Sequence, residues 1–421
     1  MQRSADRLDH EGGYMAHFFK KDTQFEFEFI RTMGQTSYGA AEIGECLATA
    51  ARIVEGDYDS WHDEWFDTAQ WLFDRSAEAE SRHGVSARDG YLRCANYYRT
   101  AEFFLHGSPG DPRIHRTSKM SVESFRRAAR LHEPGIEEVE VPYGTGHLPA
   151  YFFRAAGQSS APKPTVIIHN GFDGTAEEIY SFGGRAGQER GYHILAFEGP
   201  GQGQVIRSQG LTFRPDWEHV VGPVVDYLET RDDVDAERIA LIGISMGGVL
   251  APRAAAFEQR LAAVVAWDGV YDMSTVALDF VLGELPDPRE VLIDRIGAES
   301  DVELDEYIQR RISESGTARW FFDHGSWVMG TESPRMLLKR ICDFNVRDGV
   351  AEQIKCPVLV LEADEDMALD GQPAQLVQHL TAPYAHHSFT ARRGGELHNQ
   401  VDVMRHASSV IYDWLDAVLQ P

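Results

Sequence analysis

A Gly-Ile-Ser-Met-Gly-Gly turn at residues 243–248 constrains the fold of this chain more than any other feature. An apolar run of strand type, residues 238–242, leads into the turn, and an Ala-rich segment of helical type follows it. Small residues two before and two after Ser245 avoid backbone clashes on a strained strand-to-helix turn. The serine hydroxyl then projects above the sheet, at a helix N-terminus that favours developing negative charge. Although a bare Gly-x-Ser-x-Gly match is often an unreactive turn, this context predicts a nucleophile elbow.

Bulk composition limits the class of protein. With 421 residues, the chain is too long for one ordinary domain and suits a core of about 250 residues plus extra elements. Its 43% hydrophobic and 11% aromatic content predicts a well-filled globular interior and excludes general disorder. The net charge of −26 argues against binding to nucleic acid or to an anionic membrane, because both need positive surface.

The N-terminal sequence and the cysteines indicate the compartment. The first residues contain no apolar core of a signal peptide, and no apolar run approaches the roughly 18 residues of a membrane span. The cysteines are widely scattered without a Cys-x-x-Cys pair, which favours reduced and mostly buried thiols. They are Cys46, Cys94, Cys342 and Cys356. No Cys or His cluster has zinc spacing. We therefore expect a cytoplasmic protein without a metal site.

The chain divides into a helical part and a part in which strands and helices alternate. Residues 35–132 repeat apolar side chains at helical spacing and lack strand alternation. From about residue 136, two alternating segments are typical of a hairpin, and short apolar strands separated by helical stretches follow. The expected strands are residues 136–142, 147–154, 165–169, 193–198, 238–243, 262–268 and 358–362. This alternation predicts an α/β fold with a mostly parallel sheet.

Between residues 272 and 345 the strand signal disappears. Helical patterns replace it, together with an aromatic cluster of Trp320, Phe321, Phe322 and Trp327. We interpret this segment as a helical insertion over the sheet edge where substrate binds. The domain prediction is thus a helical domain at residues 1–134 and an α/β domain at residues 135–421 that carries the insertion.

The strand at residues 358–362 runs into an acidic turn that offers a catalytic acid. Enzymes with a Ser-Asp-His triad on this type of sheet place nucleophile, acid and base in that chain order. By register against the usual strand-Gly-x-x-Asp pattern, Ala363 takes the glycine place and Asp366 the acid place. Asp364 is the alternative, and an acidic surface turn is the plain structural interpretation.

His398 is the candidate base among 17 histidines. It lies in a Gly-containing loop, residues 393–400, between a strand-like segment and a final amphipathic helix. His386 and His387 are expected on the strand, and His406 within the helix, so position selects His398. Its expected role is to accept the Ser245 proton and then to protonate the leaving group, while the carboxylate fixes its tautomer.

Two glycine-rich loops follow the expected strands at residues 165–169 and 193–198. The loop at residues 169–175 can present backbone amides, and the expected oxyanion donors are the amides of Phe172 and Met246. The loop at residues 199–203, Gly-Pro-Gly-Gln-Gly, lacks the Lys-Ser/Thr ending of a phosphate-binding loop. We interpret this second loop as a structural turn near the active site.

Long ordered motifs give the chain a family resemblance from about residue 85 onward. They lie at residues 97–105 (Tyr-Tyr-Arg-Thr-Ala-Glu-Phe-Phe-Leu), 170–178 (Asn-Gly-Phe-Asp-Gly-Thr-Ala-Glu-Glu), 199–203, 214–218 (Arg-Pro-Asp-Trp-Glu) and 245–255. The chain resembles the α/β-hydrolase family of 2,6-dihydroxypseudooxynicotine hydrolase and the fungal heptaketide-shortening hydrolases. More distantly, it is similar to the fermentation–respiration switch proteins.

The resemblance implies an α/β-hydrolase fold with an N-terminal helical cap domain, and often a homodimer. It implies hydrolysis without a cofactor, commonly of a carbon–carbon bond beside a ketone, with esters as side substrates. The family roles fall on Ser245 as nucleophile, Asp366 as acid and His398 as base. Relatives often have Glu-His-Cys where this chain has an inserted Leu397, so the role of Glu396 stays open.

The resulting functional hypothesis is a serine-dependent hydrolase that acts through an acyl-enzyme on an apolar or aromatic ketone or ester. Asp173, Asp268 and Trp320 are candidates for the substrate pocket. Asp268 or Asp272 could add an acid for a carbon leaving group, although structural turn carboxylates are the simpler interpretation. Alternatives are a carboxylesterase, a polyketide cyclase or acyltransferase with the same triad, and a binding protein that only retains the fold.

Overall fold

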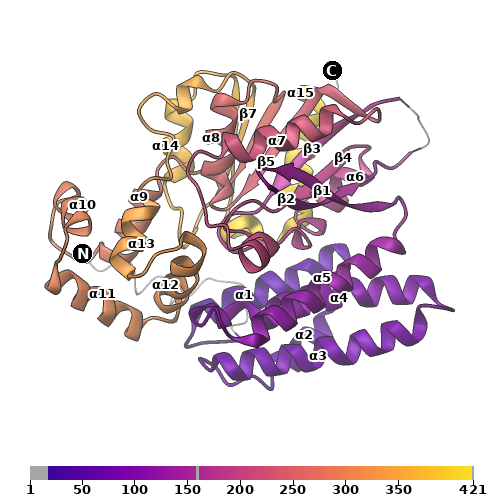
Figure 1. Cartoon of the computed structure of the whole chain (residues 1–421), viewed down its shortest axis with the longest axis horizontal. Coiled ribbons are helices and arrows are strands. Elements are labelled where there is room, and N and C mark those ends of the chain that lie inside the picture. Colours follow the sequence, from indigo (N-terminus) through magenta and orange to yellow (C-terminus); the bar gives the residue numbers. More distant parts are fainter. Residues whose placement is uncertain (1–17, 158–160, 420–421) are drawn as a thin grey trace.

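The computed structural model describes residues 18–157 and 161–419 and has one eight-stranded sheet at its centre (Figure 1). The strand order is β1-β2-β4-β3-β5-β6-β7-β8. β1 and β2 form an antiparallel hairpin, β2 pairs antiparallel with β4, and all other neighbours are parallel. The strands are β1 (Ile136–Tyr143), β2 (Gly146–Phe153), β3 (Lys163–His169), β4 (His193–Phe197), β5 (Val234–Ile244), β6 (Ala263–Trp267), β7 (Val358–Ala363) and β8 (Tyr384–Phe389). The predicted α/β class and mostly parallel sheet are confirmed.

Both faces of the central strands are buried, which explains why these strands are nearly continuous apolar runs. In β3, Val166 and Ile168 pack into one core while Ile167 packs into another, because successive side chains of a strand point to opposite faces. The core that includes Val166 also receives α6 and α15. The core that includes Ile167 receives α7 and α8. These helices are α6 (Gly184–Glu189), α7 (Glu218–Glu229), α8 (Gly247–Phe257) and α15 (Met404–Leu419).

Five N-terminal helices form a bundle beside the sheet (indigo to purple in Figure 1). Aspartate side chains cap three of them by accepting backbone N–H groups at the first turn: Asp22, Asp57 and Asp111. Buried aromatic rings fill the interior of the bundle, with Trp61 and Trp65 fully buried. The helices are α1 (Thr23–Gly34), α2 (Ile43–Ala50), α3 (Tyr58–Ala79), α4 (Gly84–Glu102) and α5 (Pro112–Arg130). The helical part therefore begins at α1, earlier than the expected residue 35.

Five further helices lie between β6 and β7, where the sequence shows no strand pattern (orange in Figure 1). They are α9 (Met273–Leu282), α10 (Arg289–Gly297), α11 (Val302–Glu314), α12 (Gly316–Met329) and α13 (Pro334–Ile341). α12 packs against α1 and against the short helix η2 (Phe103–Gly107), so the two helical parts touch each other. Over the described residues, no helix is both long enough and apolar enough to cross a membrane.

Candidate active site

Ser245 occupies the turn between β5 and α8 with φ at 62°, in the left-handed region. The glycines around it are sterically required. A Cβ on Gly243 would lie 2.1 Å from the carbonyl oxygen of Gly247, and one on Gly248 would lie 2.2 Å from that of Asp268. The amide of Ser245 donates to the carbonyl of Trp267 at the end of β6, which ties the turn to the neighbouring strand. The predicted strained elbow is thus present, with its serine half-buried.

His398 and Asp366 complete a hydrogen-bonded line with Ser245. The Nε2 of His398 lies 2.8 Å from the Oγ of Ser245, and its Nδ1 lies 2.7 Å from the Oδ2 of Asp366. Asp366 follows β7, and its other carboxylate oxygen accepts the amides of Ala368 and Leu369 at 2.8 and 2.9 Å. Because an ionised carboxylate only accepts, Nδ1 carries the proton and Nε2 is free to accept from the serine. The structure therefore brings together the three residues that chain order selected.

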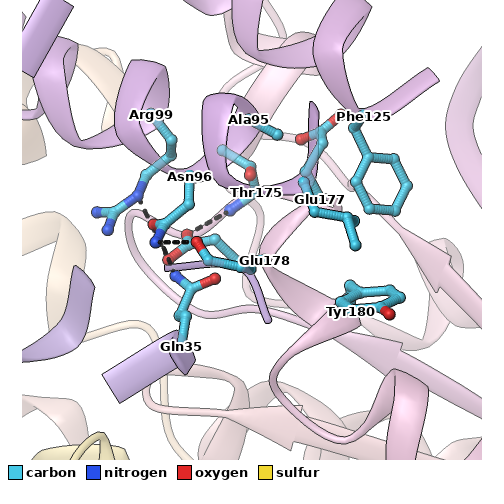
Figure 2. Close-up of a pocket in the computed structure, with 11 residues that line it drawn as sticks. Gln35, Ala95, Asn96, Arg99, Phe125, Thr175, Glu177, Glu178 and Tyr180 are labelled. Atoms are coloured by element: carbon cyan, nitrogen blue, oxygen red, sulfur yellow. Dashed lines mark hydrogen bonds and ion pairs between the residues drawn. The ribbon is translucent and has the colours of Figure 1, made fainter. Parts of the chain in front are cut away.

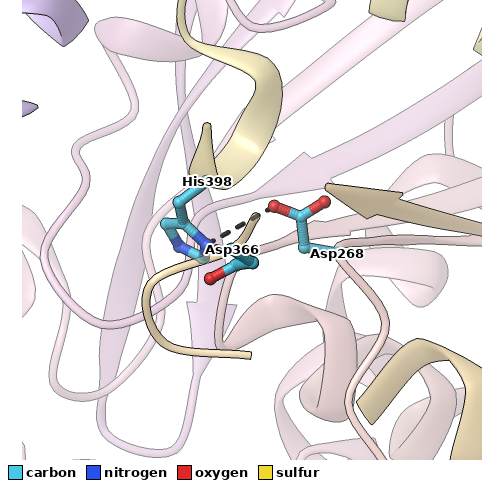
Figure 3. A group of neighbouring side chains, drawn as sticks. All are labelled: Asp268, Asp366 and His398. Atoms are coloured by element: carbon cyan, nitrogen blue, oxygen red, sulfur yellow. Dashed lines mark hydrogen bonds and ion pairs between the residues drawn. The ribbon is translucent and has the colours of Figure 1, made fainter. Parts of the chain in front are cut away.

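A second carboxylate, that of Asp268, lies next to His398 and Asp366 (Figure 3). Its Oδ2 is 3.4 Å from Nδ1 of His398, and the side chain is fully buried. It accepts the amide of Asn399 and, at 2.9 Å, the side-chain amide of Gln400, whose oxygen in turn accepts the indole N–H of Trp267. Asp268 thus holds the loop that carries His398. It was a candidate for the substrate pocket, and the structure places it on the carboxylate side of the imidazole, away from Ser245.

Backbone strain is concentrated at these residues. Non-glycine residues with positive φ include Ser245 at 62°, Asp268 at 57°, Asn399 at 57° and Gln400 at 48°. Each such residue costs of order 1–3 kcal/mol and persists only where its surroundings determine it. Strain of this kind typically gathers at functional sites, so it supports the same location as the hydrogen bonds do.

Charge couples the three buried groups. Burial opposes the charge of His398, but the carboxylates of Asp366 and Asp268 raise the pKa of its imidazole to about 9. Burial likewise opposes ionisation of Asp366, but the positive charge and hydrogen bond of His398 hold the pKa of this carboxyl below its usual range. Burial and the charge of Asp366 raise the pKa of Asp268 to about 7. Asp366 is therefore the carboxylate that stays ionised beside the histidine.

The same three side chains form a possible metal-binding group by geometry alone. One ligand atom from each of Asp268, Asp366 and His398 lies within 4.8 Å of the others. A metal on Nδ1 would require the proton of the imidazole to sit on Nε2. Nε2 then could not accept from Ser245, which lies 2.8 Å away. The cluster therefore suits a shared proton better than a metal ion.

The loop after β3 lies against the elbow. A Cβ on Gly171 would stand 2.5 Å from the amide nitrogen of Met246, so these two backbones are in direct contact. The side-chain amide of Asn170 closes the loop by donating to the carbonyl of Thr175 at 2.6 Å. Within the described residues, the amides of Phe172 and Met246 donate no hydrogen bond, and both remain available to an incoming oxygen. These are the two amides expected from the sequence as oxyanion donors.

Helix α1, which was not predicted from the sequence, contacts the candidate site. The ring of Phe27 lies 6.1 Å, centroid to centroid, from the imidazole of His398. One turn further along, Arg31 pairs with Asp173 at 2.9 Å and holds both carboxylate oxygens of Glu178. Asp173, a candidate pocket residue, is therefore engaged by the helical bundle. The alternating Phe and Glu residues of α1 resemble the period of a strand. Asp22 at the N-cap is the sequence signal that predicts a helix here.

Aromatic side chains gather around Phe172. Its ring lies 6.0 Å from Trp320, which stacks on Phe103 at 5.4 Å and is half-buried. Phe321 stacks on Phe172 from the same helix, α12, at 5.8 Å. The indole N–H of Trp320 is buried without a hydrogen-bond partner among the described residues. Trp320, a candidate pocket residue, thus lies beside the loop after β3, residues 169–175 (the oxyanion loop).

Other acidic residues considered from the sequence have different surroundings. Asp272 caps α9 by accepting the amide of Ser274 and also pairs with Arg347 at 3.5 Å. Glu396 is half-buried, and burial raises the pKa of its carboxyl. A small pocket between α4 and the segment after β3 is lined by both polar and apolar side chains, and its volume of about 10 Å³ admits no more than one water molecule (Figure 2).

The sheet order, the strained serine between β5 and α8, and the histidine before the last helix define an α/β hydrolase. Within that class, the chain belongs to the esterase FrsA-like family, whose sequence profile matches residues 44–306. Hydrolase LUC6 of Fusarium sp is 35% identical over 414 residues, covering 95% of this chain and 97% of the relative. The 20-hydroxy-prefusarin hydrolase FUS2 of Gibberella moniliformis is 34% identical over 420 residues, covering 93% and 96%.

A solved structure with the same fold is 2,6-dihydroxy-pseudo-oxynicotine hydrolase. It superposes with a TM-score of 0.69 at 21% identity, over 92% of this chain and 95% of that chain. The resemblance and the α/β-hydrolase fold expected from the sequence are confirmed. The protein is accordingly a hydrolase related to carbon–carbon hydrolases and esterases.

Proposed function

We propose that the protein is a serine hydrolase that cleaves a carbon–carbon bond beside a ketone through an acyl-enzyme. The observation that carries the proposal is the unbroken hydrogen-bonded line from Asp366 through His398 to Ser245, next to two free amides. A strained serine with both a base and unused amide donors has the parts that acyl transfer needs.

In the first half of the reaction, the Oγ of Ser245 attacks the ketone carbon and its proton passes to Nε2 of His398. The carbonyl oxygen becomes an oxyanion that accepts from the amides of Phe172 and Met246. The carbon–carbon bond then breaks, and its electron pair leaves as the enolate of the second carbonyl. His398 returns the proton from Nε2 to that carbon, which leaves the acyl group on the serine.

In the second half, water attacks the acyl-enzyme while Nε2 of His398 accepts its proton. Collapse of the second oxyanion releases the carboxylic acid and returns the proton to Ser245. Asp366 stays ionised throughout and stabilises the imidazolium that forms in each half. The reaction consumes one water and needs no oxidant, reductant or cofactor.

The surroundings of the serine support an apolar or aromatic substrate. Phe27 of α1 lies beside His398, and Phe172 of the oxyanion loop packs with Trp320 and Phe321 of α12. All four rings are partly buried. Aromatic faces bind flat apolar groups by stacking and by excluding water. The hydrolase FUS2, a relative over nearly its whole length, is described as acting on 20-hydroxy-prefusarin.

A second candidate, ester hydrolysis, is favoured by the match to an esterase family. Both reactions share acylation of Ser245, and they differ in the leaving group. An enolate is a poorer leaving group than an alkoxide, so the C–C reaction depends more strongly on proton delivery by His398.

C–C cleavage and ester hydrolysis can be distinguished by supplying the enzyme with a diketone, benzoylacetone, and an ester, phenyl butyrate, in ¹⁸O-labelled water. The products are analysed by mass spectrometry. We expect one ¹⁸O atom in benzoic or acetic acid, the matching methyl ketone, and loss of about 10⁴-fold or more of the rate in Ser245→Ala. Cleavage of the ester without any cleavage of aryl or alkyl 1,3-diketones would establish the second candidate instead.

A further inference from the structure

We infer that Gln202 and His324 are positioning residues that fix the two peptide planes on either side of Phe172, and so aim the oxyanion donor. This inference rests on the proposed function, because it concerns the amide that would hold the oxyanion. The two side chains come from the second glycine-rich loop and from α12, which the mechanism leaves without a role.

Gln202 holds the peptide that carries the donor itself. Its side-chain amide donates to the carbonyl of Gly171 at 3.0 Å and also to the carbonyl of Asn170. The carbonyl of Gly171 and the N–H of Phe172 belong to one rigid peptide unit. A hydrogen bond to that carbonyl therefore sets the direction of the N–H and polarises it.

The loop around Gln202 is built to keep this side chain in place. Gln202 is 2% exposed, and its carbonyl oxygen accepts the amide of Gly199 at 2.9 Å. Gly201 adopts φ of 89°, and a Cβ there would stand 2.2 Å from the ring of Phe213. The Gly-Pro-Gly-Gln-Gly loop therefore fixes the side chain of Gln202 as well as turning the chain.

His324 holds the following peptide. Its Nε2 lies 2.8 Å from the carbonyl oxygen of Phe172, and a carbonyl can only accept, so Nε2 carries the proton. Its Nδ1 lies 2.8 Å from Nδ1 of His106. Burial lowers the pKa of His324 to about 3, with the positive field of nearby groups adding to it, and burial also lowers the pKa of His106. His324 is therefore neutral.

The neutral state of His324 determines the direction of the hydrogen bond between the two imidazoles. With Nε2 of His324 protonated, its Nδ1 must accept, so His106 donates from Nδ1. Arg207 can only donate and lies 3.2 Å from the Nε2 of His106, so this nitrogen accepts, although the carboxylate of Glu102 also lies 3.6 Å from it. Arg207 is itself anchored on the buried carboxylate of Glu102. The hydrogen bonds run in one direction, from the Arg207–Glu102 pair through two histidines to the oxyanion loop.

The chain of contacts joins separate parts of the molecule. Glu102 and His106 belong to the N-terminal bundle, His324 to the helices between β6 and β7, and Arg207 to η4 (Val205–Gln209) after β4. The oxyanion loop is thus held on one side by the sheet domain through Gln202. On the other side it is held through His324, which depends on how the two helical parts meet.

The test uses paired variants with a matched control. Gln202→Met removes the donor to Gly171, whereas Gln204→Met makes the same change in a neighbour that contacts Ser118 of the bundle. His324→Leu removes the donor to Phe172, whereas the amide nitrogen of His324→Gln reaches the place of Nε2 and restores it. Each variant is checked for native melting temperature and circular dichroism before kinetics.

The measurements are kcat and KM for p-nitrophenyl butyrate and the inhibition constant of an aryl trifluoromethyl ketone, which forms a tetrahedral oxyanion on serine. We expect Gln202→Met and His324→Leu to lower kcat by about 10- to 100-fold at nearly constant KM. The ketone should bind more weakly in proportion to the loss of kcat/KM. Gln204→Met and His324→Gln should stay within about threefold of wild type.

Three results would overturn the inference. They are unchanged kcat in both disruptive variants, a loss that appears in KM alone, and equal losses in His324→Gln and His324→Leu when both melt like wild type. Failure of the acyl-enzyme chemistry on which the inference rests is distinct, because wild type itself would then neither turn over the ester nor bind the trifluoromethyl ketone. The choice between C–C and ester cleavage is decided separately by the diketone assay.

Discussion

At the scale of single residues, the unusual feature is that two carboxylates face one imidazole nitrogen. Asp366 lies 2.7 Å and Asp268 3.4 Å from Nδ1 of His398, and they follow different strands. Asp366 makes the direct hydrogen bond, while Asp268 supports the loop through Asn399 and Gln400. The second negative charge also stabilises protonated His398, so it shifts the pH at which the base becomes available.

The prediction is that Asp268→Asn moves the acid limb of the kcat/KM profile to lower pH. Catalysis requires neutral His398, so activity rises with pH through the pKa of this group, which the carboxylates raise to about 9. Removing one negative charge lowers that pKa, and we expect a shift of about one pH unit. Ester hydrolysis measured at pH 5–10 gives the profile.

Asp272→Asn is the matched control for this shift. Asparagine caps a helix as well as aspartate does, so the variant keeps the cap of α9 while it loses the charge. Its acid limb should coincide with that of wild type. A limb that stays in place or moves to higher pH in Asp268→Asn would contradict the assigned influence of Asp268.

At the scale of elements, α1 joins the helical bundle to the site. Its Phe27 lies over His398, and its Arg31 enters a buried group of charges with Glu28, Asp173 and Glu178. Arg99 of α4 also pairs with Glu28 at 2.9 Å. The position of α1 is therefore set by ion pairs to the loop after β3 as well as by apolar packing.

We predict that Arg31→Met destabilises the protein strongly. It removes one of the two cations, with Arg99, that neutralise the carboxylates of Glu28, Asp173 and Glu178. An uncompensated buried charge costs about 3–5 kcal/mol in the free energy of unfolding. Arg52→Met is the control, because it breaks a partly exposed pair with Glu64 and should cost about 1 kcal/mol or less. Urea unfolding followed by circular dichroism measures both, and equal losses would refute the role of Arg31.

At the scale of the whole molecule, the site is assembled from segments far apart in the chain. Arg31, Phe172, Ser245, His324 and His398 come from α1, the loop after β3, the elbow, α12 and the loop after β8. Loops at the ends of the strands carry the candidate catalytic side chains, and the two helical parts supply aromatic neighbours and contacts to the loop after β3. A change far from Ser245 can therefore alter catalysis without touching the reacting groups.

Local patterns predicted the sheet and the approach of the candidate catalytic side chains. Apolar strand runs, glycine turns and chain order led to β1–β8 and to the approach of Ser245, Asp366 and His398, because each depends on a few neighbouring residues. The division at residue 134 stays a prediction, as does the homodimer.

Contacts between distant segments could not be predicted. The Phe–Glu alternation of α1 favours a strand period, whereas the Asp22 cap and packing of its phenyl rings into the bundle stabilise a helix. Asp268 follows its strand like a pocket residue, and its contact with Asn399 depends on a loop about 130 residues later. The meeting of His106 with His324 likewise arises from tertiary packing alone.

Intact-mass analysis after treatment with a fluorophosphonate, which reacts with activated serines, tests directly whether Ser245 is the nucleophile. We predict one adduct on wild type, none on Ser245→Ala, and at most very slow labelling of His398→Ala, because the hydroxyl needs Nε2 as its base. An adduct that survives Ser245→Ala, or a folded wild type that never reacts, would contradict the central claim that Ser245 is the nucleophile.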